Sequence, residues 1–189
     1  MAHRVLITGF EPFGGNKTNA SWEAVRRLSA WDGDIEICPR LLPVEYFSAG
    51  KRLLAAAEEL RPDAIICTGV AGSRDAITPE RIAVNLRAAA IPDNAGRTAA
   101  GEPIDPDGPD GIFTRLAAED MVCDLRAAGL PAAVSFTAGT FVCNDVFYML
   151  MLHGPDVPRG FIHVPPEEKL PGEKCRDGLL ICVRAVFRK

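Results

Sequence analysis

The sequence predicts an α/β fold: a single three-layer α/β/α domain over residues 1–189, with a twisted, largely parallel central sheet. Short runs rich in Val and Ile alternate with longer segments whose apolar residues recur at helical spacing. This alternation is typical of a parallel sheet that carries helices on both faces. A chain of 189 residues fits one domain, and neither half would build a core as well as the two together.

Each expected element has a local pattern behind it. Short apolar runs predict strands over residues 4–8, 35–42, 64–68, 81–86, 132–136 and 160–164. Helical spacing of apolar residues predicts helices over residues 21–30, 46–60, 113–129, 143–152 and 173–187. Gly129, followed by Pro131, marks the end of the third helix. Residues 91–111 are dense in Pro, Gly and Asp, which is typical of a functional or mobile loop.

Charge and hydropathy exclude several classes of partner. The net charge of -4 gives no long-range attraction to nucleic acid or to an anionic membrane, so neither is expected as a partner. No apolar stretch approaches the roughly 20 residues that span a bilayer, and the first apolar run is too short for a signal peptide. We therefore expect a cytoplasmic protein.

The six cysteines include no CxxC pair, and in a reducing compartment they are expected to remain thiols. Several lie inside apolar runs, so all but one are interpreted as small buried hydrophobic residues. The three histidines show no clustered ligand spacing, so no zinc site is predicted.

Chemically useful residues follow several of the predicted strands. Ligands of open α/β sheets bind beyond the carboxyl ends of the strands. Gly-rich turns follow residues 4–8 and 64–68, Cys143 follows residues 132–136, and His163 ends the run 160–164. We therefore expect Gly-rich turns, a cysteine, a glutamate and a histidine to meet at one edge of the sheet.

Cys143 opens a predicted helix. The helix dipole can lower the pKa of such a thiol from about 8.5 to roughly 3.5–7.5, which supplies a reactive thiolate. Free N–H groups at the same helix start can hold a developing oxyanion. The alternative is that Cys143 is a small buried residue beneath Phe141 and Val142.

His163 and Glu80 each have two interpretations. His163 ends an apolar strand, so it is either a structural histidine or a general base for the thiol. Glu80 follows Thr78 and Pro79, which is how many helices begin, yet the residues after it alternate like a strand. It either begins a helix or orients His163 and stabilises its imidazolium.

The first loop, GFEPFGGNKT, weakly resembles a phosphate-binding loop. In such loops Lys directly follows the second Gly of the pattern, but here Gly15 and Asn16 separate Lys17 from it. A nucleotide site is therefore not favoured. Phe10 and Phe13 either form an apolar clamp beside the site or fill the core.

Five blocks in a fixed order give a specific resemblance: TGFEPFGG with Asn19 and SWEAV after it, GVAGSRDAITPERIAVNL, IPDNAG, AVSFTAGTFVCN and GFIHVP. Over about residues 4–166 the chain resembles the pyroglutamyl peptidase I (pyrrolidone-carboxylate peptidase) family of cysteine peptidases. TAGTFVCN and GFIHVP frame the family's nucleophile and histidine, and ITPER contains its glutamate.

The resemblance implies a triad of Cys143, His163 and Glu80 that removes N-terminal pyroglutamyl residues from peptides through a thioester. It implies no metal or organic cofactor, and assembly as a homo-oligomer. It also implies a lactam pocket made of Phe10, Phe13, Asn19, Val44, Ile91, Phe141 and Val142. Pyroglutamate has no free amine and no charge, so aromatic and apolar walls with a few hydrogen bonds suit it.

Two positions depart from the family's pattern. Many bacterial members have Gln where this chain has Val70, and Arg where it has Ala90. Both polar groups lie near the substrate region in the family, so their loss predicts weaker support of the transition state. Two rival interpretations stay open: a thiol amidase with another acyl specificity, and a pyroglutamyl-binding relative with weakened catalysis.

Overall fold

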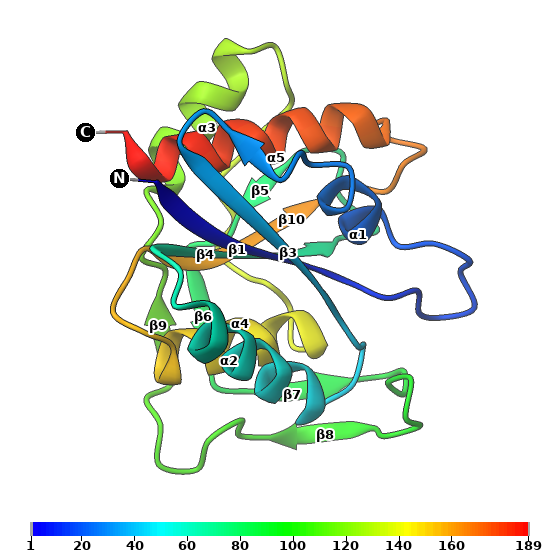
Figure 1. Cartoon of the computed structure of the whole chain (residues 1–189). Coiled ribbons are helices and arrows are strands. Elements are labelled where there is room, and N and C mark those ends of the chain that lie inside the picture. The colour runs from blue at the N-terminus through cyan, green and yellow to red at the C-terminus, as the bar shows by residue number, and fades with distance from the viewer. Residues whose placement is uncertain (1, 189) are drawn as a thin grey trace.

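Four parallel strands form the middle of the central sheet in the computed structural model, which describes residues 2–188 (Figure 1). They are β1 (His3–Phe10), β3 (Ile35–Leu42), β4 (Ala64–Val70) and β10 (Arg159–Val164). Two short antiparallel strands, β2 (Trp31–Asp32) and β5 (Thr78–Pro79), form the edges, giving the order β2-β3-β1-β4-β10-β5. The first and last residues of the predicted 1–189 domain lie outside the described residues.

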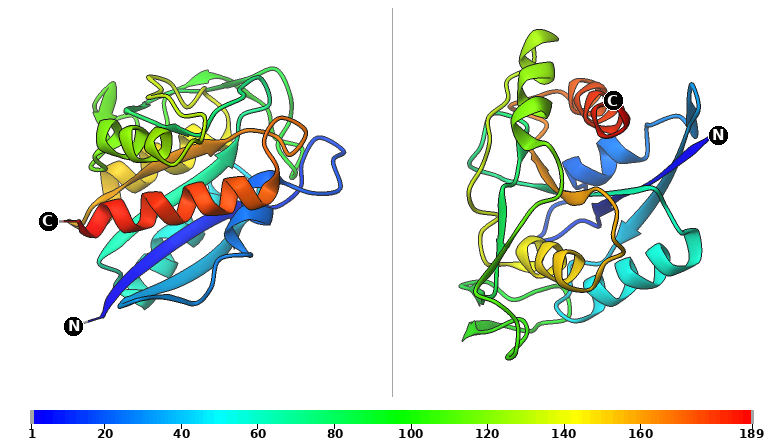
Figure 2. Two further views of the ribbon diagram at one scale, coloured as in Figure 1. Left: turned by 90° about the horizontal axis from the view of Figure 1, so that it is seen from above. Right: turned by 90° about the vertical axis from the view of Figure 1, so that its left-hand side faces the viewer.

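Helices cover both faces of this sheet, as Figures 1 and 2 show. One face carries α1 (Ala20–Val25), α3 (Ala118–Ala127) and α5 (Gly172–Phe187). The other face carries α2 (Ser48–Leu60) and α4 (Val142–His153). The predicted α/β/α fold with a largely parallel sheet is therefore confirmed.

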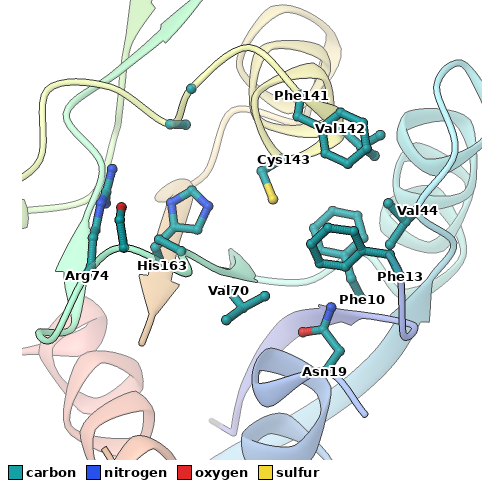
Figure 3. Close-up of a pocket in the computed structure, with 14 residues that line it drawn as sticks. Phe10, Phe13, Asn19, Val44, Val70, Arg74, Phe141, Val142, Cys143 and His163 are labelled. Carbon is teal, nitrogen blue, oxygen red and sulfur yellow. The ribbon is translucent and has the colours of Figure 1, made fainter. Parts of the chain in front are cut away.

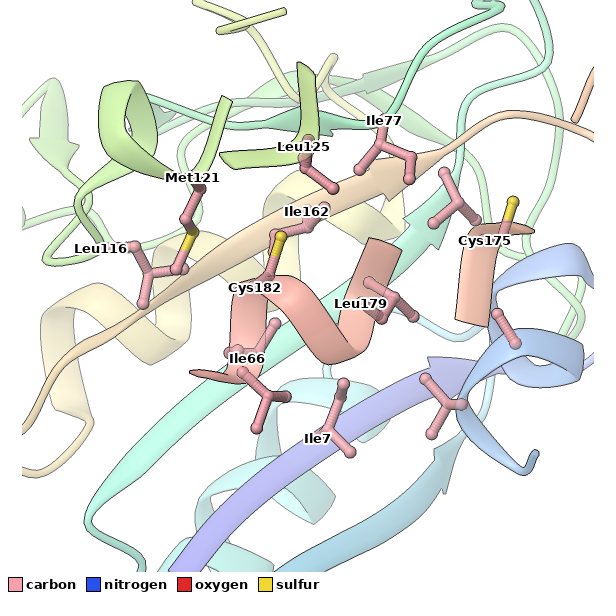
Figure 4. Close-up of a cluster of buried hydrophobic side chains, with 14 of the residues drawn as sticks. Ile7, Ile66, Ile77, Leu116, Met121, Leu125, Ile162, Cys175, Leu179 and Cys182 are labelled. Atoms are coloured by element: carbon pink, nitrogen blue, oxygen red, sulfur yellow. The ribbon is translucent and has the colours of Figure 1, made fainter. Parts of the chain in front are cut away.

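The apolar stripe of α5 shows how a helix joins the sheet. Its buried residues Cys175, Leu179 and Cys182 recur at helical spacing and belong to the same cluster as Ile66 and Ile162 of the sheet (Figure 4). Burial of a complete Leu or Ile side chain contributes about 1.5–3 kcal/mol. This cluster stabilises the sheet on the face opposite to α2 and α4.

Residues along β10 alternate between the two faces. Ile162 packs into the cluster on the α5 side, whereas Phe161 packs into the cluster on the α4 side. His163 lies two residues after Phe161, and its ring centroid is 4.8 Å from that of Phe161. The imidazole therefore projects towards α4.

Residues 82–113 differ from the prediction. The expected strand over 81–86 is shorter and lies outside the central sheet, because β6 (Ile82–Val84) pairs with β9 (Gly111–Phe113). The hairpin of β7 (Arg87–Ala89) and β8 (Ala99–Glu102) extends into the stretch expected to be irregular, because β8 lies within residues 91–111. Since residues 111–113 are extended, α3 begins later than predicted.

The predicted strand over residues 132–136 does not form. Its backbone runs beside β5 and makes only isolated bridges, between Ile77 and Ala132 and between Glu80 and Ser135. Pro79 lies between these bridges and has no N–H to donate, so the ladder is interrupted there.

Cys123 contradicts the prediction that all but one cysteine are buried, because it is exposed. The buried face of α3 contains Met121, Val122 and Leu125, which leaves Cys123 on the outer face. Among residues 2–188, no helix has both the length and the apolar character needed to cross a bilayer.

A buried ion pair attaches the β7–β8 hairpin to α4. Arg87 Nε donates to Asp145 Oδ1 at 2.5 Å, and the two side chains are 6% and 1% exposed. Nearby, the Ala88 N–H donates to the Thr140 carbonyl oxygen at 3.0 Å. The hairpin therefore supports the segment that leads into α4.

We expect Arg87→Ala to lower the free energy of unfolding by about 3–5 kcal/mol, because it leaves the Asp145 carboxyl buried without its partner. Urea denaturation measures this change. Arg184→Ala serves as the control, since Arg184 pairs with Asp32 at the surface and such pairs contribute about 0–1 kcal/mol. Equal losses in the two variants would contradict the assigned role of the buried pair.

Candidate active site

A histidine and a glutamate pair at the carboxyl end of β10. Strand β5 places Thr78 opposite His163, and Glu80 follows directly after β5. His163 Nδ1 lies 2.7 Å from Glu80 Oε1, and the side chains are 4% and 0% exposed. Because the carboxylate accepts the Nδ1–H group, Nε2 keeps its lone pair and can take up a proton.

Cys143 lies on α4, which packs against the face of the sheet towards which His163 projects, and it is the second residue of this helix. The register of β4 and β10 places Gly69 opposite His163, so a Cβ at Gly69 would project on the same face as the imidazole. Such a Cβ would lie only 2.8 Å from Cys143 Sγ. The thiol therefore occupies the space over Gly69, and it lines the same cavity as His163 (Figure 3).

The start of α4 offers free backbone donors. The first hydrogen bond of the helix runs from the Asp145 N–H to the Phe141 carbonyl oxygen at 3.1 Å. The N–H groups of Val142 and Cys143 have no acceptor within the part of the chain that the structure describes. They are therefore free to hold a developing oxyanion beside the sulfur.

Asn144 fixes the position of this helix start. Its buried side chain accepts the Val84 N–H at 3.0 Å and donates to the carbonyl oxygens of Val84 and Leu86 at 2.8 and 3.1 Å. Asn144 was not among the predicted site residues. Its position next to Cys143 is visible in the sequence, but its partners in residues 84–86 are not.

A cavity of about 230 Å³ opens beside Cys143. Six of the seven residues predicted for the lactam pocket line it: Phe10, Phe13, Asn19, Val44, Phe141 and Val142. The ring centroids of Phe13 and Phe141 lie 6.0 Å apart, so the wall is aromatic (Figure 3). Among residues 2–188, no three His, Cys, Asp or Glu side chains gather as metal ligands would.

Asn19 places an amide at this cavity. It is the N-cap of α1, and its Oδ1 accepts the N–H and the hydroxyl of Ser21 at 3.0 and 2.8 Å. Its Nδ2 donates to the Glu11 carbonyl oxygen at 3.0 Å. An amide has two N–H donors, so one is left for a ligand in the cavity.

Ile91, the seventh predicted residue, does not line the cavity and is 49% exposed. It follows β7, and the chain after it is fixed by other contacts. Asp93 accepts the Tyr46 N–H at 2.9 Å, and the Asn94 N–H donates to the Val44 carbonyl oxygen at 2.9 Å. These contacts bring the turn against the backbone of Val44 while Ile91 stays outside.

Arg74 also lines the cavity, although the sequence analysis did not single it out. Its Nη1 donates to Glu80 Oε1 at 2.5 Å, and its Nη2 donates to the Thr137 carbonyl oxygen at 2.7 Å. The available signal was an arginine in the Gly-rich loop, six residues before Glu80. Side chains six residues apart contact each other in neither a helix nor a strand, so the spacing did not predict a contact.

Burial controls the protonation of the site. It raises the pKa of the Cys143 thiol to about 12; the Glu80 carboxylate adds to this, while Arg74 and the backbone N–H of Cys143 oppose it. Burial also lowers the pKa of His163, against the raising effect of Glu80. The resting pair is therefore a neutral thiol beside a neutral imidazole.

This direction is opposite to the acidic thiol expected from the helix start. The sulfur faces a narrow, mostly apolar cavity rather than bulk water, and loss of hydration outweighs the helix dipole. Formation of a thiolate at Cys143 is therefore disfavoured unless a neighbouring group accepts the thiol proton.

Comparisons with known proteins agree with one another. A profile of the pyroglutamyl peptidase family matches residues 3–177. A pyrrolidone-carboxylate peptidase from Bacillus amyloliquefaciens is 47% identical over 177 residues, which cover 90% of this chain and 82% of the relative. One from Pseudomonas fluorescens is 47% identical over 170 residues, covering 87% and 80%.

Solved structures give the same result. The crystal structure of pyroglutamyl peptidase I from Bacillus amyloliquefaciens has a TM-score of 0.94 at 43% identity, covering 100% of this chain and 97% of that chain. A variant of pyrrolidone carboxyl peptidase from Pyrococcus furiosus has a TM-score of 0.92 at 35% identity, covering 97% of each chain.

We expect the rate at which iodoacetamide alkylates Cys143 to rise continuously from about pH 6 to about pH 9, because the thiolate fraction grows up to the raised pKa. Peptide mapping in a Cys123→Ser background measures this rate without the exposed thiol. A rate already independent of pH between about pH 6 and 8 would indicate a preformed thiolate and contradict the neutral pair.

Proposed function

Because this chain belongs to the pyroglutamyl peptidase family, we propose that Cys143, His163 and Glu80 are the nucleophile, general base and orienting acid of its reaction. The reaction is that of a cysteine peptidase, removal of an N-terminal pyroglutamyl residue. One observation carries the assignment of the three residues: the thiol and the imidazole line one cavity, and the imidazole is hydrogen-bonded to the carboxylate.

The cavity suits the pyroglutamyl ring. The uncharged lactam fits between aromatic walls such as Phe13 and Phe141, and the spare N–H of Asn19 can donate to a lactam oxygen. An ordinary N-terminus carries a charged ammonium group, and its transfer into this space would cost desolvation free energy. The cavity therefore favours a blocked, cyclic N-terminal residue.

Acylation begins when Cys143 Sγ attacks the pyroglutamyl carbonyl carbon and the thiol proton passes to His163 Nε2. The carbonyl oxygen becomes negative and accepts hydrogen bonds from the N–H groups of Val142 and Cys143. Glu80 stabilises the imidazolium through Nδ1–H. His163 then gives the proton to the leaving amine nitrogen as the C–N bond breaks, and a thioester remains.

Deacylation uses the same residues. Water attacks the thioester carbon while His163 takes one of its protons, and this proton returns to the sulfur as the C–S bond breaks. The products are pyroglutamate and, from the first step, the shortened peptide. Residues of this chain carry every proton in the scheme, which uses no cofactor.

Four further predictions accompany this function. We expect one domain over residues 1–189, which is supported by two hydrophobic clusters that pack on opposite faces of one sheet. We also expect a cytoplasmic protein that assembles as a homo-oligomer and binds neither nucleic acid nor membrane.

Release of dye from a pyroglutamyl-coupled reporter tests the proposed residues. We expect Cys143→Ala to lower kcat/KM at least about 10³-fold, because no other thiol among residues 2–188 lines the cavity and could form the thioester. Cys123→Ala, which changes an exposed thiol on α3, serves as the control and should keep full activity. Activity that survives Cys143→Ala would refute the nucleophile, and equal turnover of prolyl or glutaminyl reporters would favour the amidase of other specificity.

Val70 gives a second prediction, because it lines the cavity whereas Ala90 is exposed and does not. We expect Val70→Gln to raise kcat/KM about 2- to 10-fold, the effect of one added neutral hydrogen bond. Ala90→Arg should have a smaller effect, and Val70→Leu controls for side-chain size. No gain from Val70→Gln or Ala90→Arg would show that these departures do not limit turnover.

A further inference from the structure

Arg74 faces the buried Glu80–His163 pair from the turn after β4. The Arg74 N–H donates to the Ala71 carbonyl oxygen at 3.0 Å, which closes this turn. The Arg74 side chain is 23% exposed, whereas that of Glu80 is 0% exposed. Figure 3 shows the imidazole between Arg74 and Cys143. The guanidinium therefore reaches from the cavity wall to a carboxylate that solvent does not contact.

Both hydrogen bonds of the Glu80 carboxylate go to the same oxygen. Oε1 accepts from Arg74 Nη1 at 2.5 Å and from His163 Nδ1 at 2.7 Å. Oε2 is buried and has no hydrogen-bond partner among the described residues. Rotation of the carboxylate would break both bonds together, so Arg74 helps to hold the carboxylate in the orientation that meets the histidine.

The same guanidinium connects Glu80 to the loop before α4. Arg74 Nη1 also donates to Thr78 Oγ1 at 2.5 Å, and Nη2 donates to the Thr137 carbonyl oxygen at 2.7 Å. Thr137 directly precedes Ala138 and Gly139, which line the cavity. Gly139 has a φ of 76°, in the left-handed region that glycine adopts readily, so the loop turns tightly there. Arg74 supports this loop through its bond to Thr137.

The charge of Arg74 has a chemical consequence. The Glu80 carboxylate favours an imidazolium at His163 but opposes a thiolate at Cys143. Arg74 next to Glu80 balances the carboxylate charge. Transfer of a proton from thiol to imidazole then occurs beside a neutral ion pair rather than beside a buried, uncompensated anion.

We propose that Arg74 is a positioning residue of the peptidase reaction, holding Glu80 Oε1 against His163, supporting the 137–139 loop and balancing the Glu80 charge during proton transfer. This inference rests on the roles proposed above for Cys143, His163 and Glu80. It adds a fourth residue, which acts through the other three and forms no bond with the substrate.

Two substitutions separate the charge of Arg74 from its geometry. Arg74→Gln keeps N–H donors and removes the charge, whereas Arg74→Lys keeps the charge and loses the planar fork. Arg81→Gln is the control, since Arg81 pairs with Glu119 through partly exposed side chains. The measurements are kcat and KM on the pyroglutamyl reporter across pH, with the urea midpoint of each variant.

We expect Arg74→Gln to lower kcat about 10- to 100-fold with little change in KM, as for loss of one charged hydrogen bond. Both limbs of the kcat/KM profile should move to higher pH, because Arg74 lowers the pKa of His163 and that of Cys143. The other titratable groups that act on this pair are Glu80 and Cys67 of β4, and both are unchanged in the variant.

Arg74→Lys should lower kcat while both limbs stay at the wild-type pH, because the charge remains. In a Glu80→Gln background, Arg74→Gln should cost less than about 3-fold, since no carboxylate charge is left to balance. These two measurements keep the inference testable if Arg74→Gln alone does not fold.

Several outcomes would overturn the inference. For Arg74→Gln, these are a loss of activity without a pH shift, or a rise in KM with unchanged kcat. Full activity in Arg74→Lys would also overturn it. So would a loss from Arg74→Gln that is as large in the Glu80→Gln background as in the wild type. Wild-type activity that does not depend on Cys143 would instead refute the proposed function, and the inference with it.

Discussion

The pairing of β10 with β4 is the contact on which the candidate site depends. It sets Gly69 opposite His163, and the missing side chain leaves the space that the Cys143 sulfur fills. On the other side of β10, the short pairing with β5 brings Glu80 to the imidazole. The thiol on α4 and the carboxylate next to the sheet edge therefore both lie at the end of β10. A slip of one residue in this register would turn His163 to the opposite face.

The apolar cavity has opposing effects on binding and on chemistry. Its aromatic walls suit an uncharged ring, but the same burial raises the pKa of the thiol and lowers that of the imidazole. A stable thiolate–imidazolium pair is therefore disfavoured in the resting site. The charged groups next to it, Glu80 bonded to the imidazole and Arg74 bonded to Glu80, form an ion pair of zero net charge. In the proposed reaction, proton transfer between Cys143 and His163 leaves the total charge of this cluster unchanged.

The irregular middle of the chain supports the start of α4 rather than the substrate directly. Asn144 binds the backbone of β6, and Asp145 binds Arg87 of β7. Consecutive helix residues thus connect the helix start that carries Cys143 to two pairs of antiparallel strands. This explains why residues 82–113 contain defined strands: their backbone groups pair with one another and with the loop before Cys143.

The amino-acid sequence alone predicted the layers of the fold, the three proposed catalytic residues and most of the residues that line the cavity. Buried parallel strands such as β4 and β10 are short runs with clear ends, and the family's motifs are local. The strand over 132–136, the place of Ile91, the contact of Arg74 and the direction of the Cys143 pKa shift required the folded chain. Each depends on groups far apart in sequence: Pro79 interrupts a ladder, and Asn94 fixes a turn on Val44. The burial of the Cys143 thiol likewise depends on all the residues that pack around it, which come from several segments of the chain, so no local sequence pattern predicts it.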